Sequence, residues 1–230
     1  MPYTVTATQG GATANGMLLR LLVLTGAAAA QHGASGTQSA AAAHTVALMT
    51  TVAGSVVWSV TYNGNDAAVD PSSGNTALDA VLDTTNDCAY ATLFSAATVT
   101  PGSFTAGVID SFNGGCAAME VLPKTAGTPP AVSGTGPAVA STLTATTVTT
   151  ASFSPPAGAL LLALVSANGT PFTGNPTTVS VTASGLVFSA VVQANALNNQ
   201  YAGIFTAHIP SPGGSAGATG IVPVIATLLT

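Results

Sequence analysis

The sequence predicts an all-β protein built from two related β-sandwich units, and three observations carry that prediction. Asn-Gly pairs begin at positions 15, 63, 113 and 168, and such pairs mark turns when hydrophobic runs flank them. The segments between them are short and rich in Val, Thr, Phe and Tyr, as strands prefer. Capping boxes and a long apolar stripe with a 3.6-residue period, which would indicate helices, are missing from the sequence.

Alternation of apolar and polar residues places the clearest strands. Residues 3–8 (YTVTAT) and 178–182 (TVSVT) alternate cleanly, and residues 55–62 (SVVWSVTY) alternate over most of their length. The alternation in residues 143–150 (LTATTVTT) is less regular, but their β-branched side chains suit a strand with one solvent-exposed face. We therefore expect strands in all four places.

A repeated pattern indicates a tandem duplication. Residues 53–60 (AGSVVWSV) align with residues 157–164 (AGALLLAL), and both run on to an Asn-Gly pair. Residues 90–96 (YATLFSA) match residues 201–207 (YAGIFTA), and a Pro-Gly pair follows eleven residues after each tyrosine. Two blocks in the same order with one shared spacing are the signature of a repeat. The candidate equivalent strands between the blocks are residues 78–82 and 186–192.

The repeat sets the expected domain boundaries. The first sandwich covers residues 40–124 and the second covers residues 138–230, with about seven short strands in each. That number fits an immunoglobulin-like or a jelly-roll topology, and the sequence does not separate the two. Residues 125–137 (TAGTPPAVSGTGP) form the expected linker. Residues 1–39 stand outside the repeat, as an N-terminal arm or extra strands that could complete the first sandwich or dock onto a neighbour.

The composition excludes several classes of partner. Only 4% of the residues are charged, and the two Lys and Arg residues cannot form the basic cluster that binds nucleic acid. No apolar stretch reaches the length of about 20 residues that crosses a bilayer, so we expect no membrane insertion. Residues 1–15 lack the positive charge of a signal peptide, so we expect no export by that route. A surface with so little charge favours association, which predicts a homo-oligomer.

The sequence predicts no catalytic residue. His32 and His44 lie in or beside an Ala/Gly/Ser tract, and His208 follows a predicted strand, so none is held in an evident catalytic constellation. Residues 213–217 (GGSAG) match the Gly-x-Ser-x-Gly pattern, but neither a helical pattern nor an acidic residue follows in that unit. We therefore expect no enzyme activity, no cofactor and no catalytic metal.

Acidic residues occur only in the first predicted unit. A calcium site built from Asp66, Asp70 and backbone carbonyls is one hypothesis, because Ca²⁺ takes oxygen ligands. The alternative interpretation is that these side chains solvate the rim of the sandwich, and their spacing matches no EF-hand loop.

Three further residues carry structural hypotheses. Cys88 and Cys116, the only cysteines, could form one disulfide or remain as two buried free thiols. Trp58, the only tryptophan, aligns with Leu162, which predicts a position in the core. The alternative for Trp58 is that its ring stacks on a carbohydrate ligand.

The chain resembles structural proteins of tailed bacteriophages that infect actinobacteria, a group that includes minor tail and capsid-decoration proteins. The resemblance rests on residues 1–28 (MPYTVTATQGGATANGMLLRLLVLTGAA), on the low-charge Ala/Thr/Val/Gly composition, and on the duplicated pattern of an Ala-Gly strand followed by Tyr-Ala-x-[Leu/Ile]-Phe.

The resemblance implies a non-catalytic virion protein on the outside of the particle, assembled in the host cytoplasm. Its partners would be copies of itself, other virion proteins and host cell-wall glycan, and its role would be to stabilise the particle or contact the host surface. In a reducing cytoplasm, a disulfide between Cys88 and Cys116 would form only after release. The alternative function is a carbohydrate- or receptor-binding β-sandwich module of the adhesin type.

Overall fold

The computed structural model describes residues 2–10, 14–40, 43–65, 68–110, 114–169, 178–196 and 200–211. Within these ranges every regular element is a β-strand, which confirms the predicted all-β class. Within the same ranges there is no helix with the length and hydropathy needed to span a membrane.

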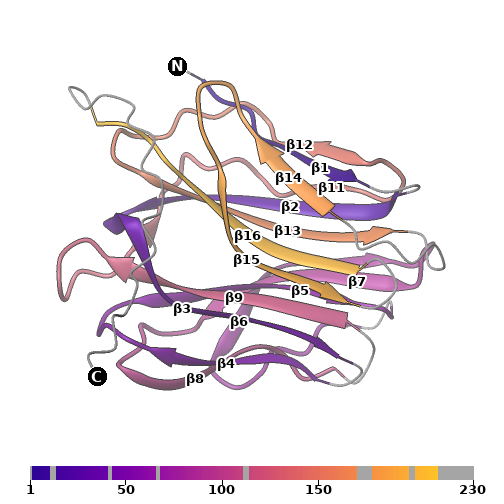
Figure 1. Cartoon of the computed structure of the whole chain (residues 1–230), viewed down its shortest axis with the longest axis horizontal. Coiled ribbons are helices and arrows are strands. Elements are labelled where there is room, and N and C mark those ends of the chain that lie inside the picture. The colour runs from indigo at the N-terminus through magenta and orange to yellow at the C-terminus, as the bar shows by residue number, and fades with distance from the viewer. Residues whose placement is uncertain are drawn as a thin grey trace, which may run out of the picture.

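The strands form four sheets that stack one above another (Figure 1). The outer three-stranded sheet contains, in spatial order, β12 (Thr147–Thr149), β1 (Thr6–Gly10) and β14 (Thr178–Thr182). The inner six-stranded sheet contains β10 (Ala131–Val132), β2 (Ala14–Thr25), β13 (Leu160–Gly169), β16 (Gln200–His208) and β15 (Ser189–Ala196), and β11 (Ala140–Thr142) also pairs with β2. The inner five-stranded sheet contains β3 (Ala27–Ala40), β9 (Gly114–Pro123), β5 (Val56–Asn63), β7 (Cys88–Ser95) and β6 (Asn75–Asp83). The outer two-stranded sheet contains β4 (His44–Thr50) and β8 (Gly102–Val108).

Three apolar layers fill the spaces between the four sheets. β13 shows how the sequence produces two of them, because successive side chains of a strand point to opposite faces. Leu161 and Val165 pack toward the outer three-stranded sheet, whereas Leu162 and Leu164 pack toward the five-stranded sheet. Both faces of β13 are therefore buried, which explains its nearly continuous apolar run.

The predicted domain boundaries differ from the observed pairing. Residues 1–39 were expected outside both units, but β1 pairs with β12 and β14, and β2 pairs with β13. β10 lies within the predicted linker, residues 125–137, and pairs with β2. We call the two sheets that contain β1, β2 and β10–β16 the split half, and the two sheets that contain β3–β9 the inserted half. The inserted half stands in sequence between β2 and β10, so the two halves are nested.

The two halves repeat one arrangement with a different chain order. In the inserted half, β8 pairs with β4 and β9 pairs with β5. In the split half, β1 pairs with β12 and β2 pairs with β13. The registers also match, because Asn63 lies opposite Gly114 in one half and Asn168 lies opposite Gly16 in the other. β1 and β2 thus take the place in the split half that β8 and β9 take in the inserted half.

Two aligned parts of the predicted repeat differ in how closely their geometries correspond. Gly54 and Gly158 both have positive φ, at 83° and 75°, and each donates its backbone N–H over 3.0 Å, to Val99 O and Ile209 O respectively. The aligned tyrosines, in contrast, face different layers. Tyr90 packs between the two inner sheets, whereas Tyr201 packs toward the outer three-stranded sheet. A one-residue slip in a strand reverses every face, which accounts for the difference.

Candidate assembly surface

Cys88 and Cys116 are free, buried thiols on opposite faces of the five-stranded sheet. Cys116 packs toward the two-stranded sheet, and Cys88 packs toward the split half. Burial raises the pKa of Cys88 to about 11 and the pKa of Cys116 to about 12. Both thiols are therefore protonated at neutral pH and lack the thiolate form that reacts with electrophiles and metals.

Trp58 is a core residue. Its side chain is only 4% exposed and lies in the layer between the two inner sheets, where its ring packs against Phe94 with 5.3 Å between centroids. A ring in that position has no free face for a carbohydrate, so the stacking hypothesis finds no support.

A buried polar cluster joins the two halves at one end of that layer. The Cys88 thiol donates to the Tyr90 hydroxyl over 3.2 Å, and the Asn168 amide donates to the Cys88 sulfur over 3.7 Å. Ser166 donates to the backbone oxygen of Thr61 over 3.0 Å. Burial raises the pKa of Tyr90 well above its usual range. The cluster is neutral and closed to solvent, so it fixes how the halves pack.

Glu120 is a fully buried carboxylate that several elements surround with donors. Ser55 donates its hydroxyl over 2.6 Å, Ala34 donates its N–H over 2.9 Å, and the N–H groups of Thr51 and Val52 lie 2.9–3.1 Å away. Burial by itself would raise the pKa of Glu120, but these hydrogen bonds hold it below its usual value of 4.5. Glu120 thereby ties β3 and the segment between β4 and β5 to β9.

An ion pair also crosses between the halves. The guanidinium Nε of Arg20, on β2, lies 3.4 Å from a carboxylate oxygen of Asp79, on β6. Both side chains are largely buried, and Thr92 donates its hydroxyl to the same Asp79 oxygen over 2.8 Å. Arg20, one of the two basic residues of the chain, is thus used inside the molecule.

The histidines stand on three different strands, because His32 is on β3, His44 is on β4 and His208 is on β16. His44 is buried, and the other two are exposed. The Gly-x-Ser-x-Gly match at residues 213–217 lies outside the described residues.

The predicted calcium ligands are only partly described. Asp66 lies outside the described residues, and the Asp70 backbone N–H lies 3.3 Å from a carboxylate oxygen of Asp110. Burial raises the pKa of Asp110, and hydrogen bonds from Asp70 and Asn63 oppose that rise. Across the described ranges, His, Cys, Asp and Glu side chains do not gather in a group of three that could hold a metal ion.

The described surface also has a shallow depression, lined by the hydroxyl and small side chains of the segment Ala96–Thr100 together with Gly74, Ser103 and Phe104. Its lining carries no charged side chain, and most of it belongs to the segment between β7 and β8.

The most distinctive surface feature is β6, which forms one edge of the five-stranded sheet and pairs with β7 on one side. Leu78 and Leu82 are 36% and 47% exposed, and Ala77 and Ala80 are exposed beside them. The acidic side chains of β6 are held inside the molecule. Asp79 forms an ion pair with Arg20, and Asp83 accepts hydrogen bonds from the backbone N–H groups of the turn residues Thr85 and Asn86. We call this edge, with its uncharged alanines and leucines, the β6 surface.

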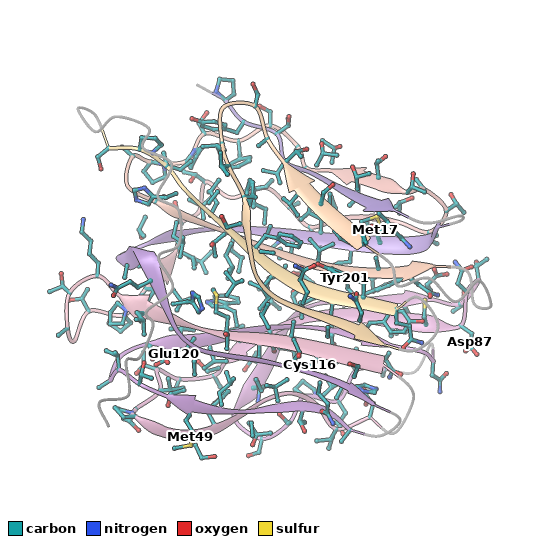
Figure 2. All side chains as sticks on the ribbon, in the orientation of Figure 1. Met17, Met49, Asp87, Cys116, Glu120 and Tyr201 are labelled. Carbon is teal, nitrogen blue, oxygen red and sulfur yellow. The ribbon has the colours of Figure 1, made fainter. Side chains whose placement is uncertain are left out.

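The other exposed large apolar residues of the described part of the chain are Met49, Ile109, Val132, Leu143 and Val187. Leu143 lies near the turn that follows β6, because its backbone oxygen accepts a hydrogen bond from Asn86. Met49 lies on the outer face of the two-stranded sheet, well away from the turn at Asp87 that follows β6 (Figure 2). Val187 lies between β14 and β15 in the split half. Neither position continues the β6 surface.

Searches against protein-family models, curated proteins and solved structures find no match to this chain.

Proposed function

We propose that this chain is a non-catalytic structural subunit on the outside of a bacteriophage particle, and that copies associate through the β6 surface. The supporting observation is that β6 pairs with β7 alone among the described strands and carries exposed leucines, while its carboxylates are turned inward. A free edge offers unpaired N–H and C=O groups, and proteins usually guard such an edge with Lys, Pro or a covering segment.

The polar interior of the molecule supports a structural role. Glu120, the Tyr90–Cys88–Asn168 cluster and the Arg20–Asp79 pair are all occupied in holding strands or halves together. Buried polar contacts that link distant segments rigidify a fold, which suits a subunit that must keep its shape outside the cell.

We also infer that each half is a β-sandwich unit and that the two halves arose by duplication. The shared glycine turns at Gly54 and Gly158 and the matching registers of β5 with β9 and of β13 with β2 support this. Among the described residues, the inserted half has seven strands and the split half has nine, and such numbers are compatible with an immunoglobulin-like or a jelly-roll sandwich.

Light scattering during size-exclusion chromatography tests the association directly. We expect the wild-type chain to have a mass several times 22.1 kDa, and a Leu78→Lys/Leu82→Lys variant to have the mass of one chain, because charge on an edge opposes pairing. A Met49→Lys/Val187→Lys variant adds the same charge at positions that are 68% and 79% exposed, and it should keep the wild-type mass. A wild-type chain that stays at 22.1 kDa at every concentration would contradict the proposal.

A further inference from the structure

The outer face of the three-stranded sheet carries only hydroxyl side chains on its described strands. β12, β1 and β14 lie together on one outer side of the stack (Figure 1). On β12 and β14 the valines are buried and the residues that alternate with them are exposed. β1 alternates in the same way, because Ala7 is buried while Thr6 and Thr8 are partly exposed. We call the outward-facing set the hydroxyl face, and its members are Thr6, Thr8, Thr147, Thr149, Thr178, Ser180 and Thr182.

The strand register arranges these hydroxyl groups in rows across the sheet. Thr6 lies opposite Thr149 on one side and opposite Thr182 on the other, and the Thr6 and Thr149 hydroxyl oxygens are hydrogen-bonded at 2.8 Å. Neighbouring strands are about 4.8 Å apart, and side chains two residues apart on one strand are about 6.7 Å apart. The hydroxyl groups therefore occupy a grid with two fixed repeats. The next row of this grid consists of Thr147, Thr8 and Ser180.

The inserted half shows that the fold does not require this uniformity. Its β4 and β8 take the places that β12 and β1 take in the split half. On the outer face of that pair, exposed Ala47 lies opposite Thr105 and exposed Met49 lies opposite Ser103. Threonine is common on exposed strands, but the equivalent place accepts Ala and Met. The unbroken hydroxyl face is thus a property of the split half alone.

The chemistry of the hydroxyl face narrows the class of ligand. With no charged side chain in the set, it offers no ion pair to a phosphate or a carboxylate. It also lacks Trp, Tyr and Arg, which dominate the binding energy of protein–protein contacts. What it offers is a hydroxyl that both donates and accepts, carried on a β-branched side chain whose χ1 is restricted. Such a grid matches a ligand that itself repeats donors and acceptors in two dimensions.

We propose that the hydroxyl face binds the surface of ice. Ice repeats hydrogen-bond donors and acceptors in two dimensions over distances of the size found in this grid. Water that bridges two hydroxyl groups makes hydrogen bonds nearly as favourable as direct ones, so waters held in rows on the face can join the ice lattice. The buried residues Ala7, Val148 and Val181 fix the sheet beneath it. This binding is independent of association through the β6 surface, which belongs to a different sheet.

Ice-affinity partitioning of the full-length chain tests the proposal. A dilute solution is frozen slowly onto a cold surface, and the protein in the ice fraction is compared with that in the remaining liquid. We expect the wild-type chain to be enriched in the ice fraction. Thr6→Tyr/Thr8→Tyr places two large rings on the middle strand of the grid and should abolish the enrichment. Thr182→Tyr, on a neighbouring strand, should also reduce it.

The matched control is Ala47→Tyr/Met49→Tyr, which places the same two rings, two residues apart, on the outer face of the inserted half. It should keep the wild-type enrichment, and far-UV circular dichroism checks that each variant keeps the wild-type fold. Exclusion of the wild-type chain from the ice would overturn the proposal. Enrichment of Thr6→Tyr/Thr8→Tyr at the wild-type level would overturn the assignment to this face.

The outcome is separable from that of the proposed function. Leu78→Lys/Leu82→Lys, which tests association through the β6 surface, leaves the hydroxyl face intact and should still be enriched in the ice fraction. Loss of enrichment in that folded variant, with a control that remains enriched, would overturn the assignment of ice binding to the hydroxyl face alone.

Discussion

At the scale of single residues, Glu120 shows how a chain with few charges uses one of them. A buried carboxylate is costly unless donors compensate it, and here backbone and hydroxyl donors from β3 and from the segment between β4 and β5 do so without a cation. The charge therefore acts as a cross-link between segments that are distant in sequence.

Glu120→Gln should lower the free energy of unfolding by about 3 kcal/mol, because the amide leaves some of these donors without an acceptor. Asp87→Asn removes the same charge at an exposed turn position with φ of 51°, where Asn is well tolerated, and should have little effect. Urea denaturation followed by circular dichroism measures both. Equal stability of the two variants would contradict the role assigned to Glu120.

The same carboxylate predicts a pH dependence. Its pKa is lower in the folded chain than in the unfolded chain, so its stabilising contribution is fully present above the unfolded value and is lost as the pH falls through the folded value. We expect the wild-type free energy of unfolding to fall as the pH drops below about 4.5, with a smaller fall in Glu120→Gln. Parallel pH profiles for the two proteins would count against this account.

Gly33 is required by the approach of Glu120. A Cβ at position 33 would overlap a Glu120 carboxylate oxygen and lie 2.9 Å from Leu122. Gly33→Ala should therefore destabilise the fold by about 2 kcal/mol. Gly134→Ala, where a Cβ would meet nothing within 4 Å, is the matched control and should change stability by less than about 0.5 kcal/mol. Thermal denaturation measures the stability of both variants. Similar unfolding midpoints for Gly33→Ala and Gly134→Ala would contradict the predicted overlap with Glu120.

At the scale of elements, the sequence predicts strands better than it predicts their partners. The alternation at residues 178–182 coincides with β14, and the strand expected at residues 55–62 nearly coincides with β5. At residues 143–150 only β12 forms, at the end of the expected segment. Local alternation requires only neighbouring residues, whereas pairing depends on contacts between segments far apart in sequence.

The place of β2 is the clearest example of that limit. The sequence repeat aligns only segments that follow one another in the same chain order, so residues 1–39 fall outside both predicted units. The available signal was the Asn-Gly pair at position 15, which corresponds to the pair at position 113 before β9. The β6 surface could not be found from sequence, because exposure of Leu78 and Leu82 follows from β6 standing at a sheet edge.

The layer between the inner sheets predicts that the halves depend on each other. Leu162, on β13, is fully buried in the same layer as Trp58, on β5. Leu162→Ala should cost about 3 kcal/mol and lower the unfolding midpoint reported by Trp58 fluorescence, although the two residues belong to different halves. Val187→Ala, at an exposed position, should leave that midpoint unchanged. If Leu162→Ala leaves the unfolding midpoint reported by Trp58 fluorescence unchanged, the two halves unfold independently.

At the scale of the whole molecule, the nested chain order links the two halves more tightly than a linker would. The chain leaves the split half after β2, builds the inserted half, and returns through β10 to pair with β2 again. The buried contacts and the Arg20–Asp79 pair then hold the two inner sheets face to face. The result is a four-sheet block in which β6, at an edge of the five-stranded sheet, pairs only with β7 among the described strands, and this edge is where we propose that a second copy joins.

Hydrogen–deuterium exchange of β6 at low and high protein concentration tests the central claim, association through this edge, most directly. We predict that β6 amides exchange more slowly at high concentration, because a second copy protects the edge, while exchange on the outer face of β4 and β8 does not change. Exchange in β6 that is equally fast at both concentrations, in a sample whose mass shows association, would contradict it.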